Sequence, residues 1–170
     1  MSAAALCRPL RGAILLLCSA DRSTVRSVSL ALRWLHVLAA ITWIGGMLFL
    51  ALVLVPVTRR LEDRALRARL FHAVGLRFRT VGWIALGVLV ATGLGNLWLY
   101  PSLLTTPGFL WKLGLVVLAL VLSAVHDFYL GPQAGAPGAD PSIRVRASWL
   151  ARINILVVLI VVLLGLSLLR

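Results

Sequence analysis

Three ionisable side chains lie inside long apolar stretches of this sequence: His36, Lys112 and His126. Ionisable groups are rare in hydrocarbon because taking a charge out of water is costly, and those found there usually pair with another group or serve a function. An imidazole can ligate a metal or carry a proton near neutral pH, and an ammonium attracts an anion. These residues are the first candidates for a site.

His36 begins a helical face of small residues that continues to Trp43 and Met47, seven and eleven residues further on. This pattern predicts a flat hollow bounded by an indole. Small residues can equally indicate close helix packing, and a lone histidine can be a hydrogen-bonding residue. As candidates we name His36 and Met47 for metal binding, and His36 and Trp43 for cofactor binding.

Lys112 is expected at the depth of His36, with Asn96 and Tyr100 reaching the same level from the preceding stretch. A buried ammonium needs an anionic partner, such as a carboxylate ligand, a haem propionate or a lipid phosphate. The alternative is that Lys112 snorkels to the head groups. Lys112 and Asn96 therefore join His36 as cofactor-binding candidates.

His126 is expected about 25 Å deeper, from the helical rise of 1.5 Å per residue, so it cannot share one metal with His36 of the same chain. It is a separate metal-ligand candidate. Its neighbour Asp127 is expected to point elsewhere and to pair with Arg152 or Arg144. His126 and Asp127 could form an inner binding or proton site, or a polar clamp at the junction of the third and fourth helices; we favour the clamp.

The elements that must position these residues are membrane helices. Hydrophobic residues make up 61% of the chain, and its mean hydropathy is +1.02, well above soluble domains. We predict an all-α, integral membrane four-helix transmembrane bundle in the lipid bilayer. Its predicted spans are about 34–57, 81–100, 109–130 and 149–169.

Prolines and polar segments set the predicted limits of these spans. Pro56 is expected to end the first span, and Gly131-Pro132 the third. The arginine-rich loop 58–80 carries Leu and Phe at helical spacing, which predicts an amphipathic helix lying on the inner membrane surface. Residues 133–142 are expected to form a flexible loop.

The basic charge fits a membrane better than nucleic acid. The chain has 17 Lys and Arg against 5 Asp and Glu, a net charge of +12, and most of these residues lie in expected loops. The positive-inside rule then predicts a multi-pass protein of the cytoplasmic (inner) membrane with both termini outside. Residues 1–26 resemble a signal or are dispensable, which leaves a domain of residues 27–170. Cys7 and Cys18 support no metal or redox site.

Several short motifs resemble the copper-resistance D (CopD) membrane family. They are Arg33-Trp34-Leu35-His36 with Thr42-Trp43-Ile44-Gly45-Gly46, then Arg69-Leu70-Phe71, Thr92-Gly93, Trp111-Lys112, His126-Asp127 and Gly131-Pro132. A similar histidine-bearing first helix occurs in the related HemJ-type protoporphyrinogen oxidases. The resemblance covers most of residues 30 to 132 and rests on the order and spacing of the motifs.

The resemblance implies copper uptake or export, or alternatively a haem b oxidoreductase that acts on porphyrinogen or quinol. Cu(I) prefers thiolate and thioether ligands, yet Met47 is the one sulfur-bearing residue in the predicted spans. A copper route would depend on His36, Met47 and His126. Haem ligated by His36 suits the donors better; its iron would be five-coordinate, or a homodimer would supply another His36 as the second axial ligand. An accessory subunit is a third, non-catalytic interpretation.

Overall fold

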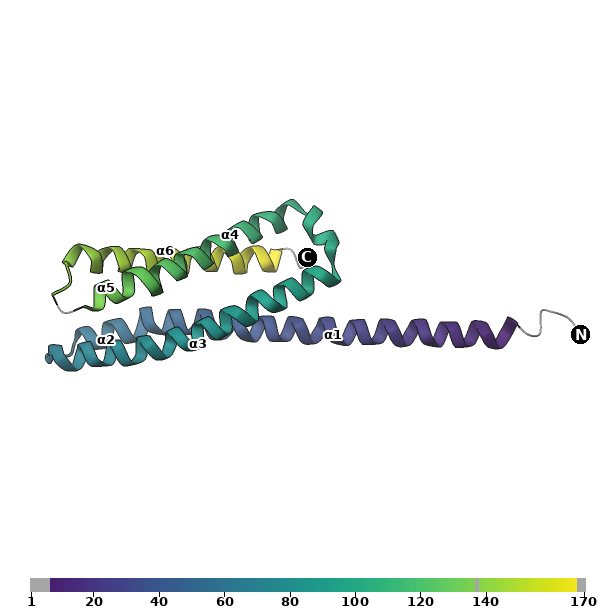
Figure 1. Cartoon of the computed structure of the whole chain (residues 1–170), viewed down its shortest axis with the longest axis horizontal. Helices are drawn as coiled ribbons and strands as arrows, with labels where there is room; N and C mark the ends of the chain where they lie inside the picture. The colour runs from purple at the N-terminus through teal and green to yellow at the C-terminus, as the bar shows by residue number, and fades with distance from the viewer. Residues whose placement is uncertain (1–6, 137, 168–170) are drawn as a thin grey trace, which may run out of the picture.

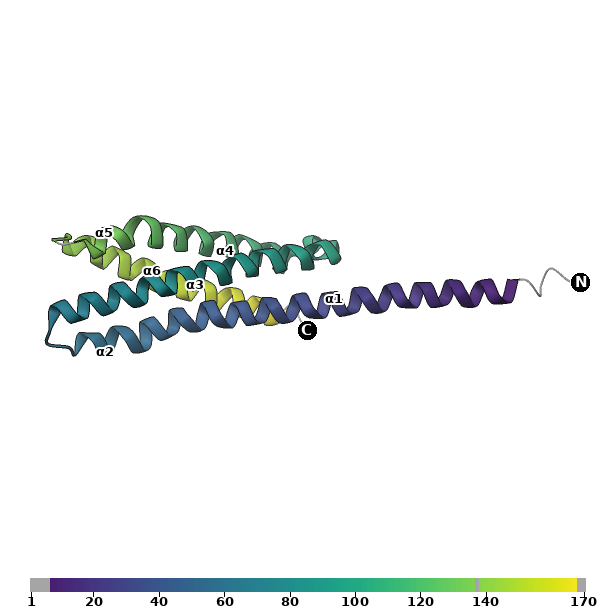
Figure 2. The same ribbon diagram turned by 60° about the horizontal axis from the view of Figure 1, so that its bottom comes forward.

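The described part of the chain folds into two helical hairpins that pack side by side (Figures 1 and 2). This computed structural model describes residues 7–136 and 138–167, with side chains from Ser23 onward except that of Arg64. Four helices are long and apolar enough to cross a membrane: Ser23–Arg59, Ala65–Leu99, Pro107–Gly135 and Pro141–Ser167. The predicted all-α four-helix membrane bundle is confirmed.

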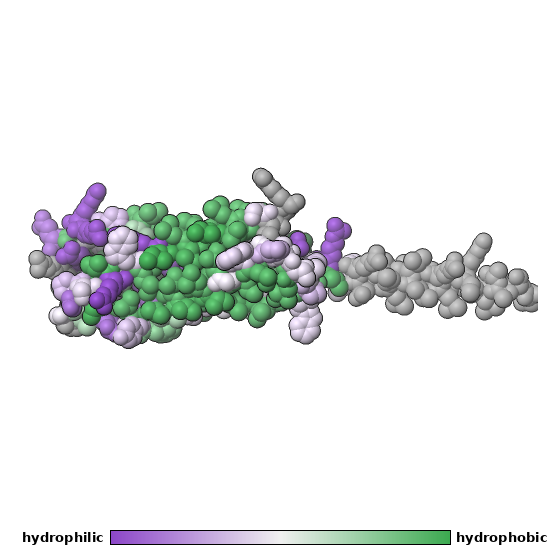
Figure 3. All heavy atoms as spheres, turned by 90° about the horizontal axis from the view of Figure 1, so that it is seen from above, coloured by the Kyte–Doolittle hydropathy of each residue, from purple (hydrophilic) through white to green (hydrophobic). Residues whose placement is uncertain are grey.

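The surface has the pattern of a protein in lipid. Hydrophobic residues cover the middle of the bundle, and hydrophilic residues gather at its ends (Figure 3). Large aromatic side chains are exposed near both ends of the spans, among them Trp98 with 87% of its surface exposed and Trp111 with 74%. Tyr129 and Trp149 are exposed near the other end. Such aromatic belts are typical of membrane interfaces.

The first hairpin begins with α1, Cys7–Phe49, whose N-terminal part projects beyond the bundle (Figure 1). A π-helical turn, η1 (Leu50–Leu54), then leads directly into α2, Val55–Arg59. The prediction that Pro56 ends the helix is therefore wrong. The wider turn just before Pro56 is where a regular helix would lose a hydrogen bond and clash with the proline ring.

Helix α3, Arg64–Leu99, follows after a turn of residues 60–63. Asp63 caps it, because its carboxylate accepts from the backbone N–H groups of Ala65 and Leu66 at 2.7 and 3.2 Å. The amphipathic segment predicted on the membrane surface is helical, but it is the first part of this continuous helix. Of its apolar residues, Phe78 lies against Gly46 of α1, whereas Leu66, Leu70 and Phe71 remain exposed.

The second hairpin starts with the short 3-10 helix η2, Pro101–Thr105, and α4, Pro107–Ala124. A second π-helical turn, η3 (Val125–Leu130), continues into α5, Gly131–Gly135. Gly131-Pro132 therefore does not stop the helix as predicted, and a widened turn again stands directly before the proline. Each hairpin thus has one π turn followed by a proline near its arginine-rich end.

Helix α6, Pro141–Ser167, begins well before the predicted span at residue 149, so Arg144 is helical. The last residues of that predicted span lie outside the described part of the chain. Asp140 precedes α6 and accepts from the Ser142 backbone N–H at 2.8 Å. This bond and one from the Ser142 side chain lower the pKa of the Asp140 carboxyl below its ordinary value.

The buried core joins all four helices. It contains Trp43 of α1 and small or branched apolar residues of the other three helices: Ala85, Leu86, Ala119, Val157 and Val158. Small side chains let membrane helices approach closely, so van der Waals packing can hold them together in lipid. At Gly46 the approach leaves no room for a side chain, because a Cβ there would clash with the Phe78 ring.

Candidate functional site

The imidazole of His36 is held by α3 through Thr92. His36 Nδ1 lies 2.9 Å from Thr92 Oγ1, and Thr92 is 5% exposed. The Thr92 hydroxyl donates to the Val88 carbonyl oxygen at 2.6 Å, which uses its one hydrogen. When the hydroxyl donates to Val88, Thr92 accepts from His36 Nδ1–H, and His36 is in the tautomer whose Nε2 carries the lone pair.

Gly93 and Asn96 complete the α3 side of this group. A Cβ at Gly93 would lie 3.6 Å from His36 Cε1, so the imidazole lies directly against the α3 backbone. Asn96 Nδ2 donates to the Thr92 carbonyl oxygen at 2.9 Å. Asn96 Oδ1 is buried and has no hydrogen-bond partner among the described residues, which leaves one acceptor free beside the imidazole.

Lys112 reaches the same level from α4. Its charge acts on His36, and its Nζ lies 3.2 Å from where a Cβ of Gly165 would stand. The ammonium is thus half-buried against α6. It has no hydrogen bond or ion pair within the described residues. We call His36, Thr92, Asn96 and Lys112 the His36 group; it draws on α1, α3 and α4.

Two other residues expected near His36 lie elsewhere. Trp43 is 8% exposed and belongs to the core, where its ring packs against Gly82. Tyr100 faces the guanidinium of Arg33, which stands 5.5 Å from the ring centre. This cation–π contact joins the end of α3 to α1. Neither side chain extends the His36 group.

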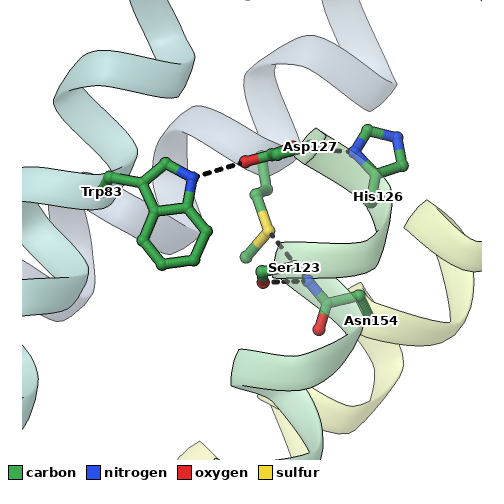
Figure 4. A network of polar contacts seen from close by, with 6 residues as sticks. Trp83, Ser123, His126, Asp127 and Asn154 are labelled. Carbon is green, nitrogen blue, oxygen red and sulfur yellow. Dashed lines mark hydrogen bonds and ion pairs between the residues drawn. The ribbon is translucent and has the colours of Figure 1, made fainter. Parts of the chain in front are cut away.

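A second polar group lies nearer the arginine-rich end, at the π turn of α4 (Figure 4). Asp127 lies between Trp83 and His126. Its Oδ2 accepts from Trp83 Nε1–H at 3.0 Å, and its Oδ1 accepts from His126 Nδ1–H at 2.9 Å. His126 Nε2 is thereby left as the free nitrogen, as in carboxylate–histidine pairs that orient metal ligands.

The predicted pairing of Asp127 with Arg152 or Arg144 is wrong, as is the expectation that Asp127 points away from His126. The π turn Val125–Leu130 changes the angle between successive side chains, and one carboxylate meets both its neighbour and α3. Arg152 stands over the Trp149 ring instead, 5.2 Å from its centre. Asp127 therefore joins the third span, through η3, to α3 of the second span, and the prediction of a clamp at the junction of the third and fourth helices is wrong for this residue.

A separate contact joins α4 to α6. Asn154 Nδ2 donates to Ser123 Oγ at 2.9 Å and lies 3.9 Å from Met47 Sδ of α1. Asn154 is 5% exposed. Met47 therefore belongs with this contact, whose Ser123 precedes His126 by three residues. Along α1, Met47 lies about 16 Å from His36 at 1.5 Å per residue.

The structure thus distributes the three predicted metal donors over two levels, with His36 at one and Met47 and His126 at the other. No group of three or more His, Cys, Asp or Glu side chains that could hold a metal ion occurs within the described residues. His36 and His126 instead each have Nδ1 in a hydrogen bond and form two separate single-imidazole positions.

Sequence reasoning missed several members of these two groups as site residues: Thr92, Trp83, Ser123 and Asn154. A usable signal was present, because hydroxyl and amide side chains inside apolar spans commonly bond across helices. Thr92 and Asn96 also share a face at a spacing of four residues. Trp83 gave no signal, since tryptophan is common in membrane helices.

Comparison with known proteins gives one family. The profile of the family described as "Copper resistance protein D" matches residues 72–168, which include Lys112 and His126 but begin after the helix that carries His36. A protein of Aquifex aeolicus (strain VF5), described as an uncharacterized protein, is 36% identical over 133 residues, or 78% of this chain and 89% of that protein. No solved structure matches the chain.

Proposed function

This chain belongs to the copper resistance protein D family, and we propose that it moves copper through the cytoplasmic membrane by way of imidazole donors at two depths. Its multi-pass membrane character follows from its four spans and its family. The arginine-rich end would face the cytoplasm under the positive-inside rule. Copper is the cargo in this proposal, with no resident metal centre.

The hydrogen bond between His36 and Thr92 carries the proposal. It supports a neutral imidazole whose Nε2 lone pair is available, the form that binds a metal ion. Imidazole suits copper, and the Met47 thioether suits Cu(I). A position with a single donor binds copper weakly. Weak binding suits transport, because a transported ion must leave each position as readily as it enters.

The test compares histidine variants in a copper-sensitive bacterial host, with cellular copper measured by elemental mass spectrometry and tolerance by growth. We expect His36→Ala and His126→Ala each to abolish the change in cellular copper that wild type produces. His72→Ala is the matched control, because His72 is an exposed histidine at the arginine-rich start of α3. Equal copper levels in wild type and His36→Ala, at equal membrane expression, would contradict the proposal.

A second candidate function, haem b binding with oxidoreductase activity on porphyrinogen or quinol, is favoured by Lys112. An ammonium beside a potential axial histidine could pair with a haem propionate, and within the described residues no other anion faces it. His36 of a second copy would supply the other axial ligand. The free Asn96 Oδ1 gives a further polar contact.

An absorption spectrum of the detergent-purified protein tests this second candidate. If haem binds, a Soret band is expected that disappears in His36→Ala and weakens in Lys112→Met, with His72→Ala unchanged. A colourless wild-type protein from haem-supplemented cells would exclude it. The spectrum and the copper measurement are independent, so they distinguish the two functions.

A further inference from the structure

We propose that a pocket at the arginine-rich end binds a phosphate-bearing anion, and that an anionic phospholipid head group is its source. This arginine pocket has a volume of about 370 Å³ and is open to the surface. It is formed by α2 and the first turns of α6, and its lining residues are Arg59, Arg144, Val145, Ser148, Trp149 and Arg152.

The positive charge of the pocket favours an anionic ligand. Three guanidinium groups line it, and within the described part of the chain none of the three has an ion-pair partner. Arginine binds phosphate through its planar fork of N–H donors, often with two parallel bonds. The Arg152 guanidinium is also set in place by stacking over Trp149 at 5.2 Å, which reduces the entropy lost on binding.

The apolar part of the lining favours a lipid over free phosphate. Val145 and Trp149 are each 56% exposed, and they form one wall beside the arginines. The pocket lies at the arginine-rich end of the bundle, because its lining residues belong to α2 and to the first turns of α6, ahead of the uncharged run 153–167. This is the depth expected for a lipid head group. A phospholipid offers both a phosphate for the arginines and an acyl chain for this wall.

Native mass spectrometry of the full chain tests the site. The protein is released from detergent after incubation with phosphatidylglycerol or phosphatidylcholine, and the bound lipid is counted. We expect wild type to retain phosphatidylglycerol, and the double variant Arg144→Gln/Arg152→Gln to bind it at least about tenfold more weakly, since bonds to charged groups contribute most of such affinity. Arg69→Gln is the control, an exposed arginine of α3 outside the pocket.

An experiment with inorganic phosphate distinguishes a phospholipid head group from free phosphate as the ligand of the pocket. If millimolar phosphate raises the melting temperature of wild type but not of the double variant, and no lipid is retained, the pocket is supported with free phosphate as its ligand. The proposed site would be overturned if wild type and the double variant retained equal amounts of phosphatidylglycerol. It would also be overturned if the double variant and Arg69→Gln lost equal amounts of bound lipid. Should the double variant aggregate, Arg152→Lys serves instead: it keeps the charge, removes the fork, and is expected to retain less lipid than wild type.

Discussion

Thr92 and His36 share a hydrogen bond across the α1–α3 interface, at 2.9 Å between Oγ1 and Nδ1. When the threonine hydrogen is given to the Val88 carbonyl within α3, this bond runs from His36 Nδ1–H to Thr92 Oγ1. A residue with no titratable group of its own thus determines which nitrogen of the histidine is free. The same outcome is reached at His126, where the carboxylate of Asp127 accepts instead.

Replacing Thr92 by valine should weaken the preference of His36 for the Nδ1–H tautomer. Thr92→Val keeps the shape of the side chain and removes the hydroxyl that lies 2.9 Å from Nδ1, so the Nδ1–H form should lose its preference over Nε2–H. Nitrogen chemical shifts of ¹⁵N-histidine in the purified protein report the tautomer directly. Thr42→Val is the control, since the exposed Thr42 hydroxyl bonds only to Leu38 of its own helix. An unchanged His36 spectrum in Thr92→Val would refute the assignment.

The adjacent glycines of α1 should respond oppositely to alanine. A Cβ at Gly46 clashes with the Phe78 ring, whereas a Cβ at Gly45 meets nothing within 4 Å. Gly46→Ala should therefore lower stability by about 1–3 kcal/mol, as overpacking does, and Gly45→Ala should be neutral or stabilising through better helix propensity. Thermal unfolding in one detergent compares the two. Equal melting temperatures would contradict the close α1–α3 approach.

Loss of the hydrogen bond from Trp83 to Asp127 should destabilise the protein more than replacement of an exposed tryptophan. Trp83→Phe removes the N–H donor at 3.0 Å while keeping an aromatic ring, and we expect a loss of about 1–2 kcal/mol, the range of interhelical polar contacts in membranes. Trp111→Phe is the matched control, since 74% of Trp111 is exposed. Chemical denaturation in mixed micelles measures both. The contact is disproved if the two variants lose stability equally.

The Asn154–Ser123 pair should be coupled energetically. Ser123→Ala removes the acceptor at 2.9 Å and leaves the buried Asn154 amide short of a partner. In a double-mutant cycle with Asn154→Leu, we expect a coupling energy of about 0.6 kcal/mol and at most about 1.7 kcal/mol. Unfolding free energies of the four proteins give this value. Strict additivity would show that the bond contributes nothing.

The membrane architecture could be predicted from sequence because it depends on long-range composition. Four apolar stretches of sufficient length and the grouping of arginines determine the fold class with little ambiguity. Pro56 and Pro132 misled the prediction of helix ends for a local reason. A proline breaks a regular helix, but a π turn before it accommodates the ring. No residue pattern in the apolar runs predicts such a turn.

The candidate sites could be predicted only in part. His36 and Lys112 were identified by their charge, and their expected common depth followed from counting residues along two helices. Partners such as Thr92 and Trp83 depend on how helices rotate about their own axes, and a sequence without periodic polar residues does not specify that rotation. Asp127 shows the difficulty most clearly, because the π turn at residues 125–130 sets its direction.

The two π turns also divide each hairpin into segments that can change independently. One residue more or less in a helix rotates everything beyond it by about 100°. A single insertion or deletion at residues 50–54 would therefore re-aim the side chains of α2, and one at residues 125–130 those of α5. The turns that follow can absorb the change, so that His36, Thr92 and Lys112 keep their positions. Related bundles could in this way acquire different side chains near the arginine-rich end while the His36 group stays unaltered.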